Sequence, residues 1–391
     1  MRNAAVSIPT YASDTSGVCS ALYELGGMTV VHDSSGCNST YSTFDEPRWY
    51  DRESLIFITG LTETEAVFGG EDRLLDDVAA AAAEFHPAFV ALCGSPMPFI
   101  IGTDYAALAG ELEDRCGLPV LGLPTTGIRT YLNGADIAWT ALLRRFCGDV
   151  RPASAFSINI LGATPLDLGL NGSVDSMKAF FQGRGITVNA CLAMGGSLAE
   201  VRLLGAAAVN LVISSAGLGP ARYLKQRFGT PFVAGLPVGR FAEDVLAALV
   251  RAGASGTDMS PCRAHHGGEG DVLVVGEAVA AASLACALES ETGRSCRVFC
   301  PLGRGGEALS AGDVLLDAED EERAAALFAG ADAIVADPLY RPVCPKGTPF
   351  LPLGHAAFSG RCHLGAIPDM TARPLADVFD LSFGESRDDR A

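Results

Sequence analysis

Residues 206–239 read AAAVNLVISSAGLGPARYLKQRFGTPFVAGLPVG, and this stretch indicates how the chain folds. The apolar run Val209–Ser214 contains several β-branched residues and predicts a buried strand. A helix is predicted at Ala221–Phe228, and a second short strand at Phe232–Ala234 lies between a proline and a glycine. Two strands joined by a helix run parallel in one sheet, so the stretch predicts a strand–helix–strand unit of an α/β protein.

The same alternation runs along the whole chain. Further strands are predicted at Met28–Val31, Leu55–Thr59, Ala88–Leu92, Pro119–Leu123, Ser157–Leu161, Thr187–Ala190, Val272–Val275, Arg297–Cys300 and Ala333–Ala336. Further helices are predicted at Arg73–Phe85, Asp136–Phe146, Val174–Gln182, Leu198–Gly205, Phe241–Arg251, Ala278–Glu289 and Glu319–Phe328. We therefore expect mostly parallel sheets with helices on both faces.

Two stretches have the composition of domain joints. They are Gly148–Ala155 and the segment Ala252–Gly270, which is rich in small and polar residues. A chain of 391 residues is too long for one core. We expect three Rossmann-like α/β domains at residues 1–150, 151–262 and 263–391.

Composition excludes several classes of protein. The net charge of −18 argues against nucleic acid as a partner, because phosphate binding needs a basic face. No apolar run is long enough to span a membrane, and the first residues show no secretory pattern, so a cytoplasmic protein is expected. No GxxxxGK[ST] string is present, so ATP binding through a P-loop is not expected.

Twelve cysteines are many for a protein of the reducing cytoplasm, where disulfides are rare. Four of them, Cys116, Cys147, Cys191 and Cys286, lie in or beside predicted helices and strands and are interpreted as small core residues.

Three other cysteines suggest an iron–sulfur site. Cys19, Cys37 and Cys93 stand in the strings GVCSALYELGG, VVHDSSGCNSTYS and FVALCGSPMPFIIGTD, which predict a glycine-containing loop or a strand end at each position. A thiolate ligand at a turn can point into a shared space, and glycine beside it lets the backbone approach a bulky cluster. No two of the three form a CxxC pair, which argues against a zinc ribbon. Buried structural cysteines are the alternative interpretation.

Several strings together resemble one family. VVHDSSGC resembles the HGPxGC segment of nitrogenase component 1 proteins, and LTETEAVFGGEDRLLDDV resembles their L-x-E-x-x-x-x-F-G-G block. FVALCGSPMPFIIGTDY resembles their segment from a strand through a cysteine to IIGDD. Residues 206–239 resemble the middle domain, and TPFLPLGHAAFSGR resembles the closing segment. The chain is similar to nitrogenase component 1-type oxidoreductases over nearly its whole length.

The resemblance implies a subunit with three Rossmann-like domains that pairs with itself or with a paralogous subunit of D/K type. It implies an iron–sulfur cluster at the subunit interface, either [4Fe–4S] or P-cluster-like. It also implies a P-loop ATPase iron protein, the NifH-like reductase of the family, as the electron donor. By motif, Cys19, Cys37 and Cys93 are the implied cluster ligands. Gly17 and Gly36 allow close approach of the backbone, and Ser95 and Ser35 are candidate donors to the cluster.

The implied function is reduction of a bound small molecule or cofactor with electrons from that partner. The alternatives are a non-catalytic scaffold for assembly of a metal cofactor, or a K-type partner of a separate catalytic chain. Ser214 stands where catalytic nitrogenase subunits have a cofactor cysteine, and Gly354 stands where they have the second cofactor ligand, with His355 beside it. A molybdenum cofactor bound in the usual way is therefore not expected.

A few other residues allow two interpretations. Cys262, His265 and His266 have metal-ligand spacing but lie in the second joint, where histidines are usually solvated. Cys362 and His363, near His355, suggest either a pocket between domains or a packed turn. Glu63 and Glu65 are better explained as residues of a helix N-terminus than as proton donors.

Overall fold

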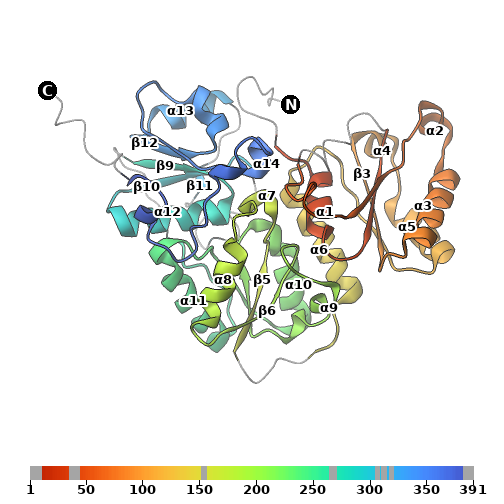
Figure 1. Cartoon of the computed structure of the whole chain (residues 1–391), viewed down its shortest axis with the longest axis horizontal. Coiled ribbons are helices and arrows are strands. Elements are labelled where there is room, and N and C mark those ends of the chain that lie inside the picture. The colour runs from red at the N-terminus through yellow and green to blue at the C-terminus, as the bar shows by residue number, and fades with distance from the viewer. Residues whose placement is uncertain are drawn as a thin grey trace.

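The computed structural model describes residues 11–34, 45–150, 156–263, 271–303, 309, 315–316 and 321–381. Helices surround three separate parallel sheets of four, four and five strands (Figure 1). The predicted fold class is confirmed. The three sheets follow one another along the chain without sharing a strand, while the domain limits at residues 150 and 262 stay predictions.

The first sheet has the order β2-β1-β3-β4 and all of its strands are parallel. One face packs on helices α1 and α6, and the other on α3 and α5. Two short helices, α2 and α4, follow the carboxyl ends of β2 and β3. The elements are β1 (Met28–His32), β2 (Leu55–Ile58), β3 (Val90–Gly94), β4 (Val120–Gly122), α1 (Asp14–Leu22), α2 (Glu63–Phe68), α3 (Glu71–Phe85), α4 (Pro96–Ile101), α5 (Tyr105–Cys116) and α6 (Tyr131–Phe146).

The middle sheet has the order β6-β5-β7-β8, and its parallel pair β7–β8, joined by α10, is the strand–helix–strand unit that the sequence predicts. Its elements are β5 (Ser157–Leu161), β6 (Thr187–Cys191), β7 (Val209–Val212), β8 (Phe232–Ala234), α7 (Pro165–Leu168), α8 (Ser173–Gln182), α9 (Leu198–Val201), α10 (Leu218–Phe228) and α11 (Ala242–Ser255). The 3-10 turns η2 (Leu204–Ala206), η3 (Ser215–Gly217) and η4 (Gly239–Phe241) lie between them.

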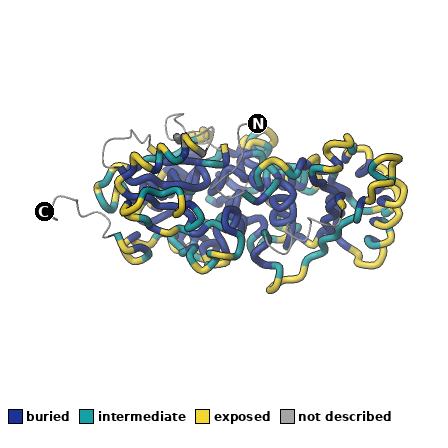
Figure 2. The backbone as a smooth tube through the Cα atoms, turned by 90° about the horizontal axis from the view of Figure 1, so that it is seen from above, coloured by how far each residue is buried: buried dark blue, intermediate teal, exposed yellow. Residues whose placement is uncertain are grey.

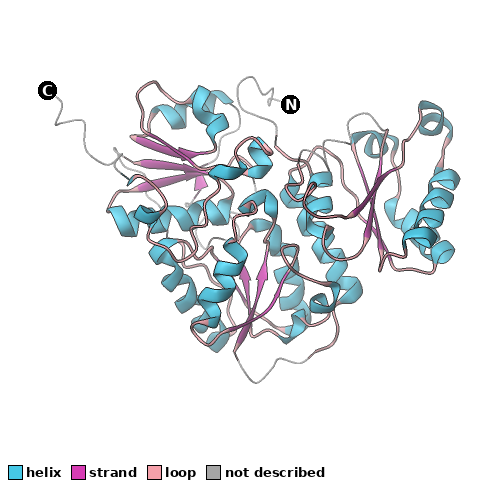
Figure 3. Cartoon of the chain, in the orientation of Figure 1, coloured by secondary structure: helices cyan, strands magenta, loops and turns pink. Residues whose placement is uncertain are grey.

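The last sheet has the order β11-β10-β9-β12-β13 and is also parallel (Figure 3). Its elements are β9 (Val272–Val275), β10 (Cys296–Phe299), β11 (Leu315–Leu316), β12 (Ala333–Ala336), β13 (Phe350–Pro352), α12 (Ala278–Thr292), α13 (Glu321–Ala329) and α14 (Ala356–Ser359). Three 3-10 turns complete it: η6 (Pro338–Val343), η7 (Leu364–Ala366) and η8 (Leu375–Asp377). Within the described residues, no helix combines the length and hydropathy that crossing a membrane requires.

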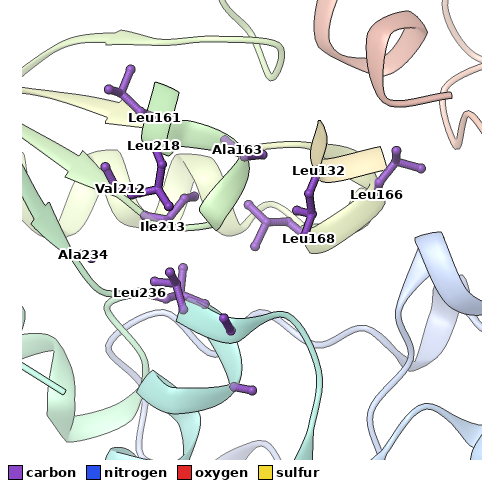
Figure 4. Packing of buried hydrophobic residues seen from close by; sticks show 14 of the residues in the cluster. Leu132, Leu161, Ala163, Leu166, Leu168, Val212, Ile213, Leu218, Ala234 and Leu236 are labelled. Carbon is purple, nitrogen blue, oxygen red and sulfur yellow. The ribbon is translucent and has the colours of Figure 1, made fainter. Parts of the chain in front are cut away.

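Buried backbone runs through all three sheets, and the exposed segments gather toward the outer end of the first one (Figure 2). The core is continuous from the middle sheet to α6, where Leu132 lies near Leu166 and Leu168 of α7 (Figure 4). None of the described cysteines forms a disulfide with another described residue. Cys147, Cys191 and Cys286 are buried as predicted, whereas Cys116 at the end of α5 is only partly buried.

Helix α6 is shared by the first and middle parts of the molecule. On one side it packs against α1 so closely that the backbones touch: a Cβ at Gly17 would lie 2.0 Å from the Tyr131 carbonyl oxygen. A Cβ at Gly134 would lie 1.7 Å from the Asp14 carbonyl oxygen. On the other side, Asp136 of α6 accepts a hydrogen bond of 2.6 Å from the backbone N–H of Gly219 in α10. The first and middle parts are therefore joined through a helix that belongs to both.

Arg48 joins parts of the molecule that are distant in sequence. Its guanidinium is buried and donates to both carboxylate oxygens of Glu46, at 2.6 and 2.9 Å, and to Glu24 at 2.9 Å. It also donates to the carbonyl of Ala193, just after β6, at 2.5 Å. Arg361 of the C-terminal part donates to the carbonyl of Glu46 at 2.6 Å. The segment that follows residue 44 is thus held by contacts with both later sheets.

Replacement of Gly134 by alanine tests the contact between α1 and α6. The added methyl group has no space against the Asp14 carbonyl, so we expect a loss of about 2 kcal/mol or more in unfolding free energy. The matched control is Gly110→Ala in α5, where a Cβ meets nothing within 4 Å. Alanine there should stabilise the chain by up to about 1 kcal/mol, because glycine is a poor helix former. Urea unfolding of both variants provides the measurement, and equal effects would contradict the packing argument.

Candidate functional site

Cys93 and Cys19 lie in one buried cluster on the α1 face of the first sheet. Cys93 is the penultimate residue of β3, as a ligand at a strand end requires. Cys19 is not in a loop: it lies in the second half of helix α1, so that expectation was wrong. Helix α1 forms because its small residues pack against α6, which the local sequence does not show.

Both thiols are completely buried, and this decides their ionisation. Burial, together with the nearby Glu46 and Asp45, raises the pKa of the Cys19 thiol to about 12. Burial also raises the pKa of Cys93 well above its usual value, with Cys19 and Asp14 adding to the effect. Both side chains are therefore neutral thiols at neutral pH, and a metal that binds them has to displace their protons.

The described residues do not include Cys37, Gly36 or Ser35. The described residues before and after this stretch show where its two ends lie. The chain leaves after β1, whose last residue His32 pairs with Gly94, the residue after Cys93. It re-enters at Asp45, which accepts a hydrogen bond of 2.5 Å from Ser16 on the helix that carries Cys19. The segment that carries Cys37 therefore begins beside the strand of Cys93 and ends on the helix of Cys19.

The two remaining predicted residues have different surroundings. The space beside Gly17 is filled by the Tyr131 carbonyl, so this glycine serves the contact between α1 and α6. Ser95 is fully buried at the start of α4, and its hydroxyl has no hydrogen-bond partner among the described residues. The Tyr105 hydroxyl, which lies against Gly94, also has none there. The two buried thiols could serve as ligands of an iron–sulfur cluster, and the two hydroxyls could donate hydrogen bonds to its sulfur atoms. These residues therefore suit a thiolate-ligated cluster.

The described residues alone contain no group of three or more Cys, His, Asp or Glu side chains placed to hold a metal ion. A cluster that uses Cys19 and Cys93 therefore needs ligands from outside them. His265 and His266 also lie outside the described residues, so a site with the buried Cys262 stays a prediction.

A second feature is a cavity between the middle and last sheets, with an empty volume of about 710 Å³ including its mouth. Its walls come from α7, from the segment after β8, from α12 and from the chain on both sides of η7. His355 lines it, whereas Cys362 is exposed and, like His363, is not part of the wall. Of the three residues suggested by sequence, only His355 therefore belongs to the pocket.

Two buried carboxyl groups in this cavity were missed by the sequence analysis. Glu277 caps α12, and its side chain accepts from the backbone N–H groups of Val279 and Ala280, both at 3.0 Å. Its other oxygen accepts from the N–H of Ser215 at 2.9 Å. Asp167 in α7 accepts a hydrogen bond from the Tyr131 hydroxyl. The available signal was an acidic residue a few positions after a buried strand, at the edge where parallel sheets bind ligands.

His355 completes the polar side of the cavity. Its Nε2 lies 3.4 Å from Asp167, its ring stacks on Phe358 with 4.1 Å between centroids, and neither ring nitrogen makes a hydrogen bond to a described residue. Burial, together with the negative charge of Asp167, raises the pKa of Glu277 to about 7. The cavity therefore holds a carboxyl group that changes protonation near neutral pH.

A family model described as nitrogenase component 1 type oxidoreductase matches residues 16–253, more than half of the chain. The chain belongs to the nitrogenase component 1 type oxidoreductase family. The matched range contains the strings of all three predicted ligand cysteines.

Similar curated proteins of this family cover several activities. The nitrogenase iron-molybdenum cofactor biosynthesis protein NifE of Bradyrhizobium diazoefficiens is 30% identical over 183 residues, 46% of this chain and 33% of the relative. A subunit of the light-independent protochlorophyllide reductase of Prosthecochloris aestuarii is 25% identical over 231 residues, 56% of this chain and 42% of the relative. The alignments thus span between a third and less than half of these relatives.

A solved structure titled "Nitrogenase Cp1 at pH 5" has the same fold. It superimposes with a TM-score of 0.66 at 17% sequence identity and covers 94% of this chain and 88% of its own. The three-sheet architecture of this chain is therefore that of a nitrogenase component 1 protein.

Glu65 behaves as predicted for a helix start. Thr62 and Glu65 form a capping box at α2, in which the Thr62 hydroxyl accepts from the Glu65 N–H and the Glu65 carboxylate accepts from the Thr62 N–H.

The pH dependence of stability tests the electrostatics of the cavity. Since the pKa of Glu277 is about 7 in the folded chain and its usual value is 4.5, the folded state holds an extra proton between these values. This group therefore stabilises the fold fully below about pH 4.5, and the contribution is lost as pH rises through about 7. Asp167→Asn removes a negative charge that raises this pKa. The unfolding free energy of the variant should therefore fall less between about pH 5 and about pH 8 than that of the unmodified chain. Urea titrations at both pH values, with the exposed Asp51→Asn as control, provide the comparison; identical slopes in all three proteins would refute the coupling.

Proposed function

We propose that this chain is a subunit of a nitrogenase-like reductase. It would take electrons from an ATP-dependent iron protein through an iron–sulfur cluster at a subunit interface and reduce a small molecule or cofactor bound by the chain. When bound, the cluster supplies single-electron transfer at a low potential. The chain itself would contribute the ligand thiols, donors near them and a cavity that excludes water from the substrate.

One observation carries the proposal. Cys19 and Cys93 are both buried on the α1 face of the first sheet, close enough that a charge on Cys19 raises the pKa of Cys93. The described chain stops beside the strand of Cys93 and resumes at Asp45, against the helix of Cys19, with Cys37 in the sequence between these points. In this proposal, Cys37 would join Cys19 and Cys93 at one corner of the first sheet. Three thiolates from one chain do not enclose a cluster, so a second subunit, a copy of this chain or a paralogue, would complete the site.

The carboxyl edge of the first sheet supports a role for a protein partner. Large apolar side chains are exposed there on three consecutive connections: Phe68 in α2 is 84% exposed, Ile100 in α4 is 72% exposed, and Ile128 after β4 is 70% exposed. The chain that leads to Cys37 leaves the same edge, after β1. Gathered apolar residues of this kind are typical of interaction surfaces. A P-loop ATPase iron protein docked here would lie next to the proposed cluster.

A second candidate function is a scaffold on which a metal cofactor is assembled. The observation in its favour is the 30% identity to NifE, a cofactor biosynthesis protein. Both functions use the cluster, but only the reductase releases a reduced product in repeated turnovers.

Iron content tests the cluster. Protein purified without oxygen, or reconstituted with iron and sulfide, should be brown and contain roughly four or more irons per dimer. Cys37→Ala and Cys93→Ala should lose or convert the cluster, because no other group replaces a thiolate ligand there. Cys147→Ala and Cys286→Ala should retain it and lose about 1 kcal/mol of stability as truncated core residues. Colourless protein, or equal iron loss in both sets, would show that the ligands are wrongly assigned.

Replacement of the exposed apolar residues tests the docking surface. The double variant Phe68→Asp with Ile100→Asp should slow ATP-dependent reduction of the cluster by an iron protein from the same organism, since charge at an apolar contact weakens binding. Iron content and reduction by dithionite should stay as in the unmodified chain. The control is Val250→Asp in α11, a residue that is 53% exposed on the middle part. Equal rates for both variants would place the docking surface elsewhere.

A further inference from the structure

We propose that the cavity between the middle and last sheets binds an uncharged or cationic small molecule with a mainly apolar surface, and that it rejects anions. This inference rests on the proposed function, because it assigns this cavity as the substrate site, and it adds the chemical class of the substrate.

The walls of the cavity explain why the bound molecule would have a mainly apolar surface. Most of the lining side chains are aliphatic and come from all sides, among them Leu168, Leu236, Val275, Leu284, Leu353 and Ile367. A surface of this kind binds an apolar body by removing it from water. The titratable side chains of Glu277 and His355 both lie near Asp167, and Asn171, Ser173 and Thr371 add further polar atoms to the wall.

The charges in the cavity explain why it would reject anions. The side chain of Asp167 is 4% exposed and Glu277 is 1% exposed as a residue, so both carboxyl groups are removed from solvent. No lysine or arginine is among the described residues that line the cavity. An anion placed here would be desolvated beside like charge, whereas a cation would meet two acceptors.

The carboxyl groups are also held in place. Glu277 is fixed by three backbone N–H groups, and Asp167 is fixed by the Tyr131 and Thr164 hydroxyls. Burial and Asp167 keep the pKa of Tyr131 well above its usual value, so its phenol stays a donor. Fixed acceptors without a lysine or arginine among the described lining residues favour binding of a positive group at this spot.

The groups that face Glu277 are few. They are Asp167 on α7, Tyr131 on α6 and His355 before α14, while Asp337 lies behind His355 and accepts from its backbone N–H at 2.7 Å. As pH rises through the pKa of Glu277, about 7, the cavity gains negative charge. Affinity for a cation should then increase, and affinity for a neutral molecule should not change.

Three probes that share a cyclohexyl ring and differ in charge test the specificity: cyclohexylammonium, cyclohexanol and cyclohexanecarboxylate. Binding to the full chain is measured by calorimetry or ligand-observed NMR at about pH 6 and about pH 8. The cation and the alcohol should each bind at least about tenfold more tightly than the carboxylate, and the cation should bind more tightly at the higher pH. Preferred binding of the carboxylate, or no binding of any probe, would overturn the proposal.

Variants locate the binding in this cavity. Asp167→Asn should weaken cyclohexylammonium binding about tenfold and leave cyclohexanol binding unchanged, which a general loss of structure would not do. Gly276 lies in the wall, and a Cβ there would meet only Ala281 at 3.5 Å, so Gly276→Leu should fill the space and abolish binding of both probes. Gly110→Leu in α5 is the matched control and should bind as the unmodified chain does. Undiminished binding to Gly276→Leu would place the site elsewhere and overturn the assignment.

The test of the cavity and the test of the proposed function can fail independently of each other. Iron content and cluster reduction report on the cysteines of the first sheet, whereas probe binding reports on a cavity formed by other residues. Iron with no probe selectivity would reject the cavity assignment alone, and selective binding without iron would reject the reductase.

Discussion

The buried guanidinium of Arg48 is the interaction on which the arrangement of the three sheets most depends. An unpaired charge in the interior is very unfavourable, so Arg48 is stable only while Glu46, Glu24 and the Ala193 carbonyl stay in place. Glu24 in turn accepts from the N–H of Gly195, and Arg361 holds the carbonyl of Glu46. These groups come from all three parts of the chain. Movement of one part would therefore remove hydrogen-bond partners from buried groups in the others. The same network holds Glu46 and Arg48, at the start of the described stretch that follows residue 44.

The regular part of the fold could be predicted because buried parallel strands have a distinct composition. Short β-branched runs such as Ser157–Leu161 and Val272–Val275 are found as strands with the predicted limits. Helix α1 was missed because DTSGVCSAL contains few strong helix formers. Its helical state depends on α6, more than a hundred residues later, which accepts its small residues at backbone distance. Tertiary packing therefore decided the local structure, and for that reason Cys19 lies on a helix.

Some residues of the candidate site could likewise be predicted from the local sequence, and others could not. Cys93 at a strand end and the capping box at Thr62 could be predicted because both follow from local spacing. The acidic pair of the cavity could not. Asp167 and Glu277 are 110 positions apart and each is unremarkable in its own loop. Their burial arises only when α7 packs against the start of α12, and sequence periodicity carries no information about that contact. The resemblance to the family supplied the cluster ligands but not these carboxyl groups.

The close joining of the chain's two ends has a consequence for how the protein is made. Ala12 donates its N–H to the carbonyl of Ala357 at 2.9 Å and accepts from the N–H of Tyr131, also at 2.9 Å. On the ribosome, residue 12 emerges long before residue 357, and at roughly 5–20 residues per second the delay is on the order of 20–70 s. Helix α1, which carries Cys19, can pack once α6 has emerged, whereas the N–H of Ala12 finds its partner only after residue 357 has been made. The segment before α1 is therefore completed in two steps, the first with α6 and the second with the last part of the chain.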